Sequence, residues 1–89
     1  MLELKDFEAA YNKVQEVVLP TKLIKSDYFS DQTGNDVYLK PENMQLTGAY
    51  KIRGAYYKIS TLSEEEKAKG LITASAGNHA QGVALAAAR

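Results

Sequence analysis

The strongest constraint on the fold is a short apolar run that passes through a turn of small residues directly into a helix. Residues 71–74 read Leu-Ile-Thr-Ala, residues 75–77 read Ser-Ala-Gly, and helix-forming residues fill the chain from Asn78 onward. A compact apolar run followed at once by a helix is typical of the strand-to-helix connections of α/β proteins. The sequence therefore predicts an α/β fold with a parallel sheet.

The N-terminal half contains one predicted amphipathic helix and two candidate strands. In residues 6–18 apolar side chains recur every three or four positions, with Asp6 as the expected N-cap. Residues 21–24 are a candidate short strand, and residues 37–40 alternate and are rich in strand formers. Residues 33–36 read Thr-Gly-Asn-Asp, which is turn chemistry, whereas the segment just before them carries no clear signal.

Two more helices are predicted before the apolar run. The first starts near Thr47, whose hydroxyl is the expected cap. Its predicted buried face consists of Ile52, Ala55, Ile59 and Leu62. Residues 63–66 read Ser-Glu-Glu-Glu, a capping box that opens a short helix ending at Gly70.

Composition narrows the function classes. Eleven basic residues match eleven acidic ones, and this zero net charge argues against nucleic acid or an anionic membrane as the main partner. Absence of cysteine excludes a disulfide framework and a thiolate metal site, and we expect no metal. No apolar run approaches the roughly 20 residues that span a bilayer, and the N-terminus lacks the pattern of a secretory signal. We therefore expect a cytoplasmic protein.

The last helix has no terminating residue. Glycine, asparagine or proline usually ends a helix, but this chain stops at Arg89 among strong helix formers. We expect residues 1–89 to be the N-terminal piece of a longer protein, without an internal domain boundary. A frayed natural C-terminus is the alternative interpretation.

Lys51 is a candidate nucleophile. A lysine that forms a Schiff base with a carbonyl must spend time as the neutral amine. The first turn of a helix opposes a cation, and we expect repulsion from Arg53 and desolvation by Tyr50 and Ile52 to add to this effect. The alternative is an ordinary solvated surface lysine.

The turn at residues 75–77 is a candidate anion cradle. Small residues that enter a helix expose several backbone N–H groups to one point, and the helix dipole favours an anion there. Gly77 allows the backbone to approach a ligand closely. An ordinary strand-to-helix connection is the alternative.

Residues 47–55 (Thr-Gly-Ala-Tyr-Lys-Ile-Arg-Gly-Ala) and residues 75–82 (Ser-Ala-Gly-Asn-His-Ala-Gln-Gly) together resemble the threonine dehydratase and serine racemase group of fold type II pyridoxal-phosphate enzymes. The cofactor lysine of this group lies in a segment like Thr-Gly-Ser-Phe-Lys-x-Arg-Gly, with the lysine at Lys51. Ala49 and Tyr50 replace the usual serine and phenylalanine. The resemblance implies pyridoxal 5'-phosphate as cofactor and the N-terminal portion of a tryptophan synthase β-like fold.

The resemblance also implies roles for individual residues. Lys51 is the catalytic lysine that binds the cofactor, the Tyr50 ring lies beside the cofactor, and the Asn78 side chain hydrogen-bonds its phenolic oxygen. The substrate carboxylate is held chiefly through backbone N–H groups in the segment that contains Ser75, Ala76, Gly77 and His79. The His79 imidazole is not expected to act as an acid or base, because a single histidine without a carboxylate partner is usually structural.

Ala76 discriminates within the group. Racemase-type relatives typically carry serine at this position, and a racemase needs a second acid or base on the opposite face of the substrate. The methyl group of Ala76 favours chemistry on one face, hence an L-threonine or L-serine ammonia-lyase that releases 2-oxobutanoate or pyruvate and ammonia. Serine racemase is the alternative within the family, and cysteine synthase relatives fit less well.

Outside the family, the alternative is a noncatalytic anion-binding α/β module or an inactive fragment. The resemblance further implies a small-molecule amino-acid substrate and a homo-oligomer when the protein is full length. The group's glycine-rich phosphate loop and its partner for the pyridine nitrogen are expected outside these 89 residues.

Overall fold

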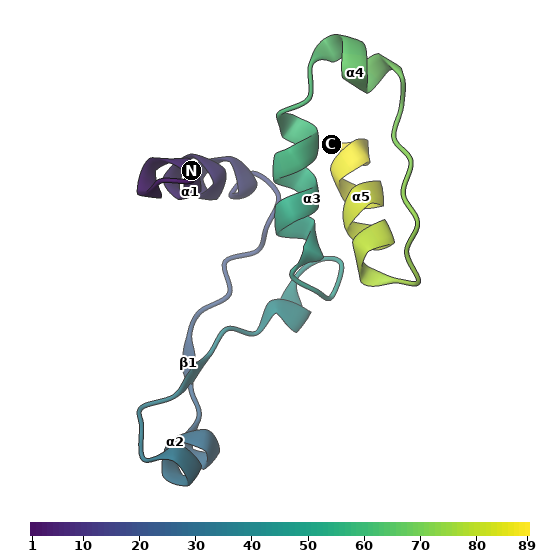
Figure 1. Cartoon of the computed structure of the whole chain (residues 1–89). Coiled ribbons are helices and arrows are strands. Elements are labelled where there is room, and N and C mark those ends of the chain that lie inside the picture. The colour runs from purple at the N-terminus through teal and green to yellow at the C-terminus, as the bar shows by residue number, and fades with distance from the viewer.

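The computed structural model describes all residues from Met1 to Arg89. The elements in chain order are α1 (Leu4–Val14), β1 (Ile24–Lys25), α2 (Asp27–Thr33), β2 (Tyr38–Leu39), the 3₁₀ turn η1 (Glu42–Met44), α3 (Lys51–Ser60), α4 (Glu64–Ala68) and α5 (Asn78–Ala88). The molecule is elongated, with extents of 52 × 31 × 22 Å. Helices α1, α3 and α5 gather at one end, and the hairpin with α2 projects away from them (Figure 1).

The core lies where α5 packs along α3. These helices lie side by side with their N-termini at the same end of the pair (Figure 1). The buried cluster consists of Val17, Ile52, Ala55 and Ala86. Ile52 is only 1% exposed, and Ile59 is half-buried against this cluster. The predicted buried face of α3 is therefore confirmed for Ile52, Ala55 and Ile59, whereas Leu62, also half-buried, lies two residues beyond the end of the helix.

The capping box of α4 is confirmed. Ser63 Oγ accepts a hydrogen bond from Glu66 N at 3.1 Å, and Glu66 Oε1 accepts one from Ser63 N at 2.9 Å. The predicted cap of α1 was wrong by three residues. Glu3 is the N-cap, and Asp6 Oδ2 accepts a hydrogen bond from Glu3 N at 2.8 Å, which completes a capping box.

The predicted cap at Thr47 was also wrong. Helix α3 begins only at Lys51, after a turn in which Gly48 has a φ of 75°. This left-handed conformation favours glycine and reverses the chain between η1 and α3. Thr47 Oγ1 instead donates to the Ala49 carbonyl at 3.4 Å.

The paired strands are short and antiparallel. Ile24 lies opposite Leu39 and Lys25 lies opposite Tyr38. The strand expected at residues 37–40 is present but shortened, whereas the strand expected at residues 21–24 is displaced and overlaps β1 only at Ile24. Between them lies α2, which the sequence interpretation missed. Ser26 Oγ caps this helix by accepting a hydrogen bond from Phe29 N at 3.2 Å.

Residues 71–74 do not form the predicted strand. They are extended but unpaired, and Ile72 is 98% exposed. A strand needs a neighbouring strand for its backbone hydrogen bonds, and the two paired strands of this chain lie at the other end of the molecule. The parallel sheet is therefore not formed by these 89 residues.

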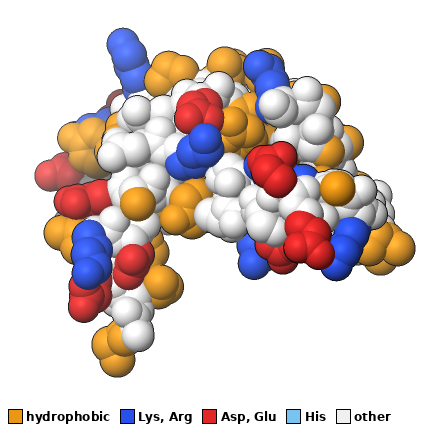
Figure 2. Space-filling model, turned by 90° about the horizontal axis from the view of Figure 1, so that it is seen from above, with side chains coloured by type: hydrophobic (Ala, Val, Ile, Leu, Met, Phe, Trp, Pro, Cys, Tyr) orange, Lys and Arg blue, Asp and Glu red, His pale blue; other side chains and the backbone are white.

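Few side chains are buried, and large apolar ones lie on the surface. Only eight of 89 residues are buried. Viewed from above, hydrophobic side chains lie on the surface among charged ones (Figure 2). The exposed aromatic side chains include Phe7, Tyr11, Tyr28, Phe29, Tyr38 and Tyr50. No helix here has both the length and the apolar character needed to cross a bilayer.

Candidate active site

Lys51 is the first residue of α3, as its predicted place in the first turn requires. Its side chain is exposed, and its Nζ lies 5.3 Å from the centroid of the Tyr50 ring, within the range of a cation–π contact. The Lys51 amine takes part in no ion pair or hydrogen bond. The desolvation that we expected from Tyr50 and Ile52 is absent, because Tyr50 is 59% exposed and Ile52 faces the core.

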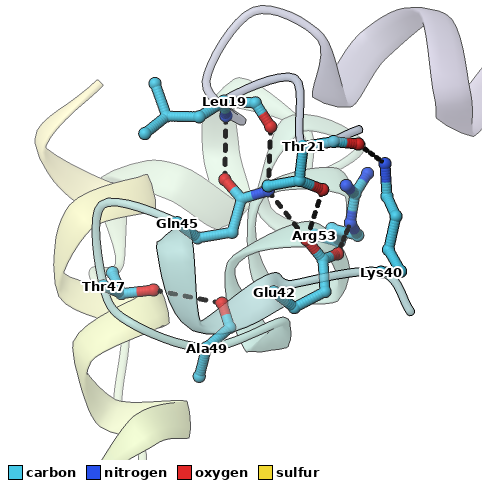
Figure 3. Close-up of polar contacts among 8 residues, drawn as sticks. All are labelled: Leu19, Thr21, Lys40, Glu42, Gln45, Thr47, Ala49 and Arg53. Atoms are coloured by element: carbon cyan, nitrogen blue, oxygen red, sulfur yellow. Dashed lines mark hydrogen bonds and ion pairs between the residues drawn. The ribbon is translucent and has the colours of Figure 1, made fainter. Parts of the chain in front are cut away.

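A polar network lies behind the first turn of α3 (Figure 3). Arg53 Nε donates to Glu42 Oε1, forming an ion pair. The other oxygen of Glu42 accepts hydrogen bonds from Gln45 Nε2 at 2.9 Å and from Thr21 Oγ1 at 3.3 Å. The carboxylate of Glu42 therefore joins α3 to η1 and to the segment before β1.

Gln45 extends this network to Leu19. Its side chain is buried, accepts a hydrogen bond from Leu19 N at 2.8 Å and donates to Leu19 O at 2.9 Å. Lys40 Nζ donates to the Thr21 carbonyl nearby. These contacts connect segments that are far apart in the sequence, and no buried side-chain nitrogen or oxygen atom in the chain lacks a partner.

The network changes the expected role of Arg53. Its hydrogen bond to Glu42 is the main reason why the pKa of Glu42 falls to about 2; the hydrogen bonds from Gln45 and Thr21 act in the same direction, and burial opposes them. Because the guanidinium is paired with an ionised carboxylate, we correct the expectation that it repels a cation at Lys51. Arg53 instead stabilises the turn that carries Lys51.

The sequence analysis did not identify Glu42, Gln45 and Thr21 as the residues that hold the first turn of α3 through Arg53. The partners lie up to 26 positions apart in the sequence. Spacing along one helix or strand therefore does not connect them.

The predicted anion cradle is an exposed turn at the start of α5. Gly77 N donates to Ser75 Oγ at 3.2 Å, and Gln81 N donates to the Gly77 carbonyl at 3.1 Å in the first helical turn. The side chains of Ser75, Ala76, Asn78 and His79 are exposed. The first N–H groups of a helix have no partner within it, so those at the start of α5 are available to a ligand.

The packing of α3 against α5 brings the two motifs to one end of the helix pair. Lys51 and Asn78 each begin their helix, at the ends that lie side by side in Figure 1. No hydrogen bond joins Lys51 to the turn. A cavity of about 300 Å³ lies alongside, between α3, the extended residues 71–73 and α5. His79 lines this cavity and Lys51 does not.

Comparison with known proteins identifies the family. Residues 14–89 match the family described as "Pyridoxal-phosphate dependent enzyme". This chain belongs to that family.

Named relatives and solved structures agree with this assignment. The chain is 55% identical over 87 residues to the L-threonine ammonia-lyase of Thermotoga maritima, a match that covers 98% of this chain and 22% of that protein. Maize serine racemase superimposes with a TM-score of 0.85 at 36% identity, covering 96% of this chain and 27% of that one. For the processed threonine deaminase isoform 2 of Solanum lycopersicum, the TM-score is 0.77 at 40% identity, with coverage of 98% and 27%. The predicted fold class is confirmed, and the chain spans about a quarter of the length of these relatives.

The residues of the candidate site fit pyridoxal phosphate, the cofactor of this family. The Lys51 amine is exposed and unpaired, as a nucleophile toward an aldehyde must be. The Tyr50 ring lies next to that amine, and the Asn78 amide, at the start of α5, has no hydrogen-bond partner in the structure. An amine, an aromatic face and a free amide are suited to an aldehyde on a planar aromatic ring.

Proposed function

We propose that this chain supplies the catalytic lysine and the substrate-carboxylate cradle of a pyridoxal-phosphate-dependent L-threonine or L-serine ammonia-lyase, within a longer polypeptide. The observation that carries the proposal is the arrangement at the shared end of α3 and α5. There, the free Lys51 amine lies at the start of one helix and the turn 75–77 leads into the other. Identity of 55% to an L-threonine ammonia-lyase supports the same activity.

Each residue has a defined task in this reaction. Bound pyridoxal phosphate supplies an electron sink for the negative charge that develops at the substrate α-carbon. Lys51 Nζ would hold the cofactor through a covalent bond, and as a free amine it would accept the α-proton of the substrate as a general base. Backbone N–H groups between Ser75 and His79 orient the substrate carboxylate, and Asn78 and Tyr50 hold the cofactor ring. In the net reaction, the α-proton and the β-hydroxyl leave as water, and hydrolysis by one water releases ammonia and gives 2-oxobutanoate from threonine or pyruvate from serine.

Serine racemase is the second candidate, because maize serine racemase has a closely similar structure. A racemase must also deliver a proton to the face opposite the lysine. Ala76 offers only a methyl group in the turn where racemase-type relatives carry a hydroxyl. This difference favours the ammonia-lyase.

The wider setting follows from the same proposal. The partner is a small-molecule amino acid, and we expect a homo-oligomer in the cytoplasm. With threonine as substrate, the 2-oxobutanoate product would serve isoleucine biosynthesis.

Borohydride reduction of the full-length protein in the presence of pyridoxal phosphate, followed by peptide mapping, tests the proposal. The adduct should lie on the peptide that contains Lys51, and Lys51→Ala should abolish both the adduct and ammonia release from L-threonine. Lys58→Ala is the matched control, because Lys58 is an exposed lysine of the same helix. An adduct confined to Lys40 or Lys58 would contradict the assignment.

A further inference from the structure

Gly82 is the point at which α5 approaches the Lys51 backbone. It is a buried residue one turn into α5. A Cβ atom built on Gly82 would lie 3.2 Å from both the carbonyl carbon and the carbonyl oxygen of Lys51, and 3.3 Å from Ile52 N. These separations are shorter than ordinary van der Waals contact, so a methyl group at Gly82 requires its neighbours to shift by a few tenths of an ångström.

We infer that Gly82 is a positioning residue that sets the placement of the Lys51 amine relative to the turn at residues 75–77. The inference rests on the proposed function, because it concerns the geometry of the same site. Gly82 follows Asn78 by four residues, a rise of about 6 Å, which is slightly more than one helical turn. A shift at the Gly82 contact therefore changes the offset between the first residue of α3 and the first residues of α5.

Two features keep the Lys51 backbone from yielding to an added methyl group. Arg53 N donates to the Tyr50 carbonyl at 3.0 Å, which closes the turn around Lys51. The Arg53 side chain is paired with Glu42, which is itself bound to Gln45 and Thr21. Because these bonds hold the first turn of α3 to η1 and to residue 21, the displacement caused by an added methyl group is taken up between α3 and α5.

Gly54 provides a matched control. It lies inside α3, three residues after Lys51, and a Cβ atom built on it meets nothing within 4 Å. Gly54→Ala therefore adds the same methyl group to a helix without a collision. Alanine is a better helix former than glycine, so this variant should have a higher Tm than the wild type.

The experiment compares Gly82→Ala, Gly54→Ala and the wild type in the full-length protein. The measurements are Tm, the rate of borohydride-trapped pyridoxal-phosphate adduct formation at Lys51, and kcat and KM for L-threonine. A shift of a few tenths of an ångström at reacting groups should slow adduct formation and lower kcat/KM about tenfold in Gly82→Ala. For Gly54→Ala, the rate of adduct formation and kcat/KM should both stay within about twofold of the wild-type values, because the added methyl group displaces no neighbouring atom.

A third variant separates positioning from general packing. Ala86 is 4% exposed and lies one turn further along the same face of α5, away from Lys51. Ala86→Val should lower Tm through overpacking, while its adduct rate at Lys51 stays near the wild-type value. An equal loss of adduct rate in Ala86→Val and Gly82→Ala would overturn the positioning role.

The outcomes distinguish the inference from the proposed function. A wild-type protein that forms no adduct at Lys51 refutes the proposed function. If the wild type forms the adduct and Gly82→Ala forms it equally fast, only the positioning role is refuted. Should Gly82→Ala fail to fold, a crystal structure of the wild-type protein decides. In that structure, an ideal Cβ atom built on Gly82 that lies more than 4 Å from the Lys51 peptide would overturn the inference. A distance near 3.2 Å from the Lys51 carbonyl would uphold it.

Discussion

Replacing Glu42 by glutamine should destabilise the full-length protein mainly through the loss of its ion pair with Arg53. The Glu42 and Arg53 side chains are only 19% and 30% exposed, and glutamine keeps the shape while removing the charge. Lowering the pKa of Glu42 from 4.5 to about 2 corresponds to a stabilisation of at most about 3 kcal/mol. Solvent screening reduces this value, so we expect Glu42→Gln to cost about 1–2 kcal/mol near neutral pH.

The sign of the pH dependence follows from the direction of the pKa shift. The pKa of Glu42 is lower in the folded state, so its contribution is fully present above the unfolded value of 4.5. The contribution is lost as the pH falls through the folded value of about 2. The stability difference between the wild type and Glu42→Gln should therefore shrink between about pH 4.5 and about pH 2.

Urea unfolding at a series of pH values from neutral to acidic measures this difference. Glu64→Gln is the control, because its side chain is 93% exposed and its pair with Lys67 spans 3.7 Å. The control should change the free energy of unfolding near neutral pH by less than about 0.5 kcal/mol. A difference between wild type and Glu42→Gln that stays constant down to about pH 2 would refute the argument, since the loss would then not depend on the carboxylate charge.

Three further predictions concern the core, the reaction and the isolated chain. Ile52→Ala should lower the free energy of unfolding of the full-length protein by about 2–5 kcal/mol, measured by urea titration, because this fully buried side chain leaves a cavity. Pyruvate should greatly exceed D-serine when the full-length protein is incubated with L-serine, and Ala76→Ser should raise the racemised fraction; comparable amounts from the wild type would contradict the role of Ala76. Residues 1–89 alone should fold poorly and release no ammonia from L-threonine, because only eight residues are buried; a well-dispersed amide correlation spectrum together with turnover would contradict this.

Local features were predictable from the sequence where neighbouring residues determine them. The capping box at Ser63 and the buried face of α3 depend on contacts within one helix, and the structure confirms both. The turn at residues 33–36 is confirmed by Gly34, which ends α2 with a φ of 70°. Helix α2 itself was missed, although Ser26 followed by Asp27 is an N-cap signal, because seven residues show little apolar periodicity.

Features that depend on distant partners were not predictable. The apolar composition of residues 71–74 indicates a strand, but strand formation requires a neighbour that this chain does not place there. The charge of Arg53 is visible in the sequence, whereas its pairing with Glu42 depends on the turn at Gly48. The positions of Lys51 and of the turn 75–77 were predicted, but their side-by-side arrangement follows from the packing of α3 on α5.

The Gln45 side-chain amide both accepts a hydrogen bond from Leu19 N and donates one to Leu19 O. Two residues that face each other in an antiparallel sheet exchange the same pair of N–H···O bonds through their backbones. The side-chain amide of Gln45 thus takes the place of a neighbouring strand beside Pro20, which has no backbone N–H for pairing with one. The chain leaving α1 is thus anchored before any sheet begins. The anchor joins it to η1 and, through Glu42, to the helix that carries Lys51. A change in the path of residues 19–21 would therefore be transmitted to the helix of the reactive amine through the side chains of Gln45 and Thr21, which both bind Glu42.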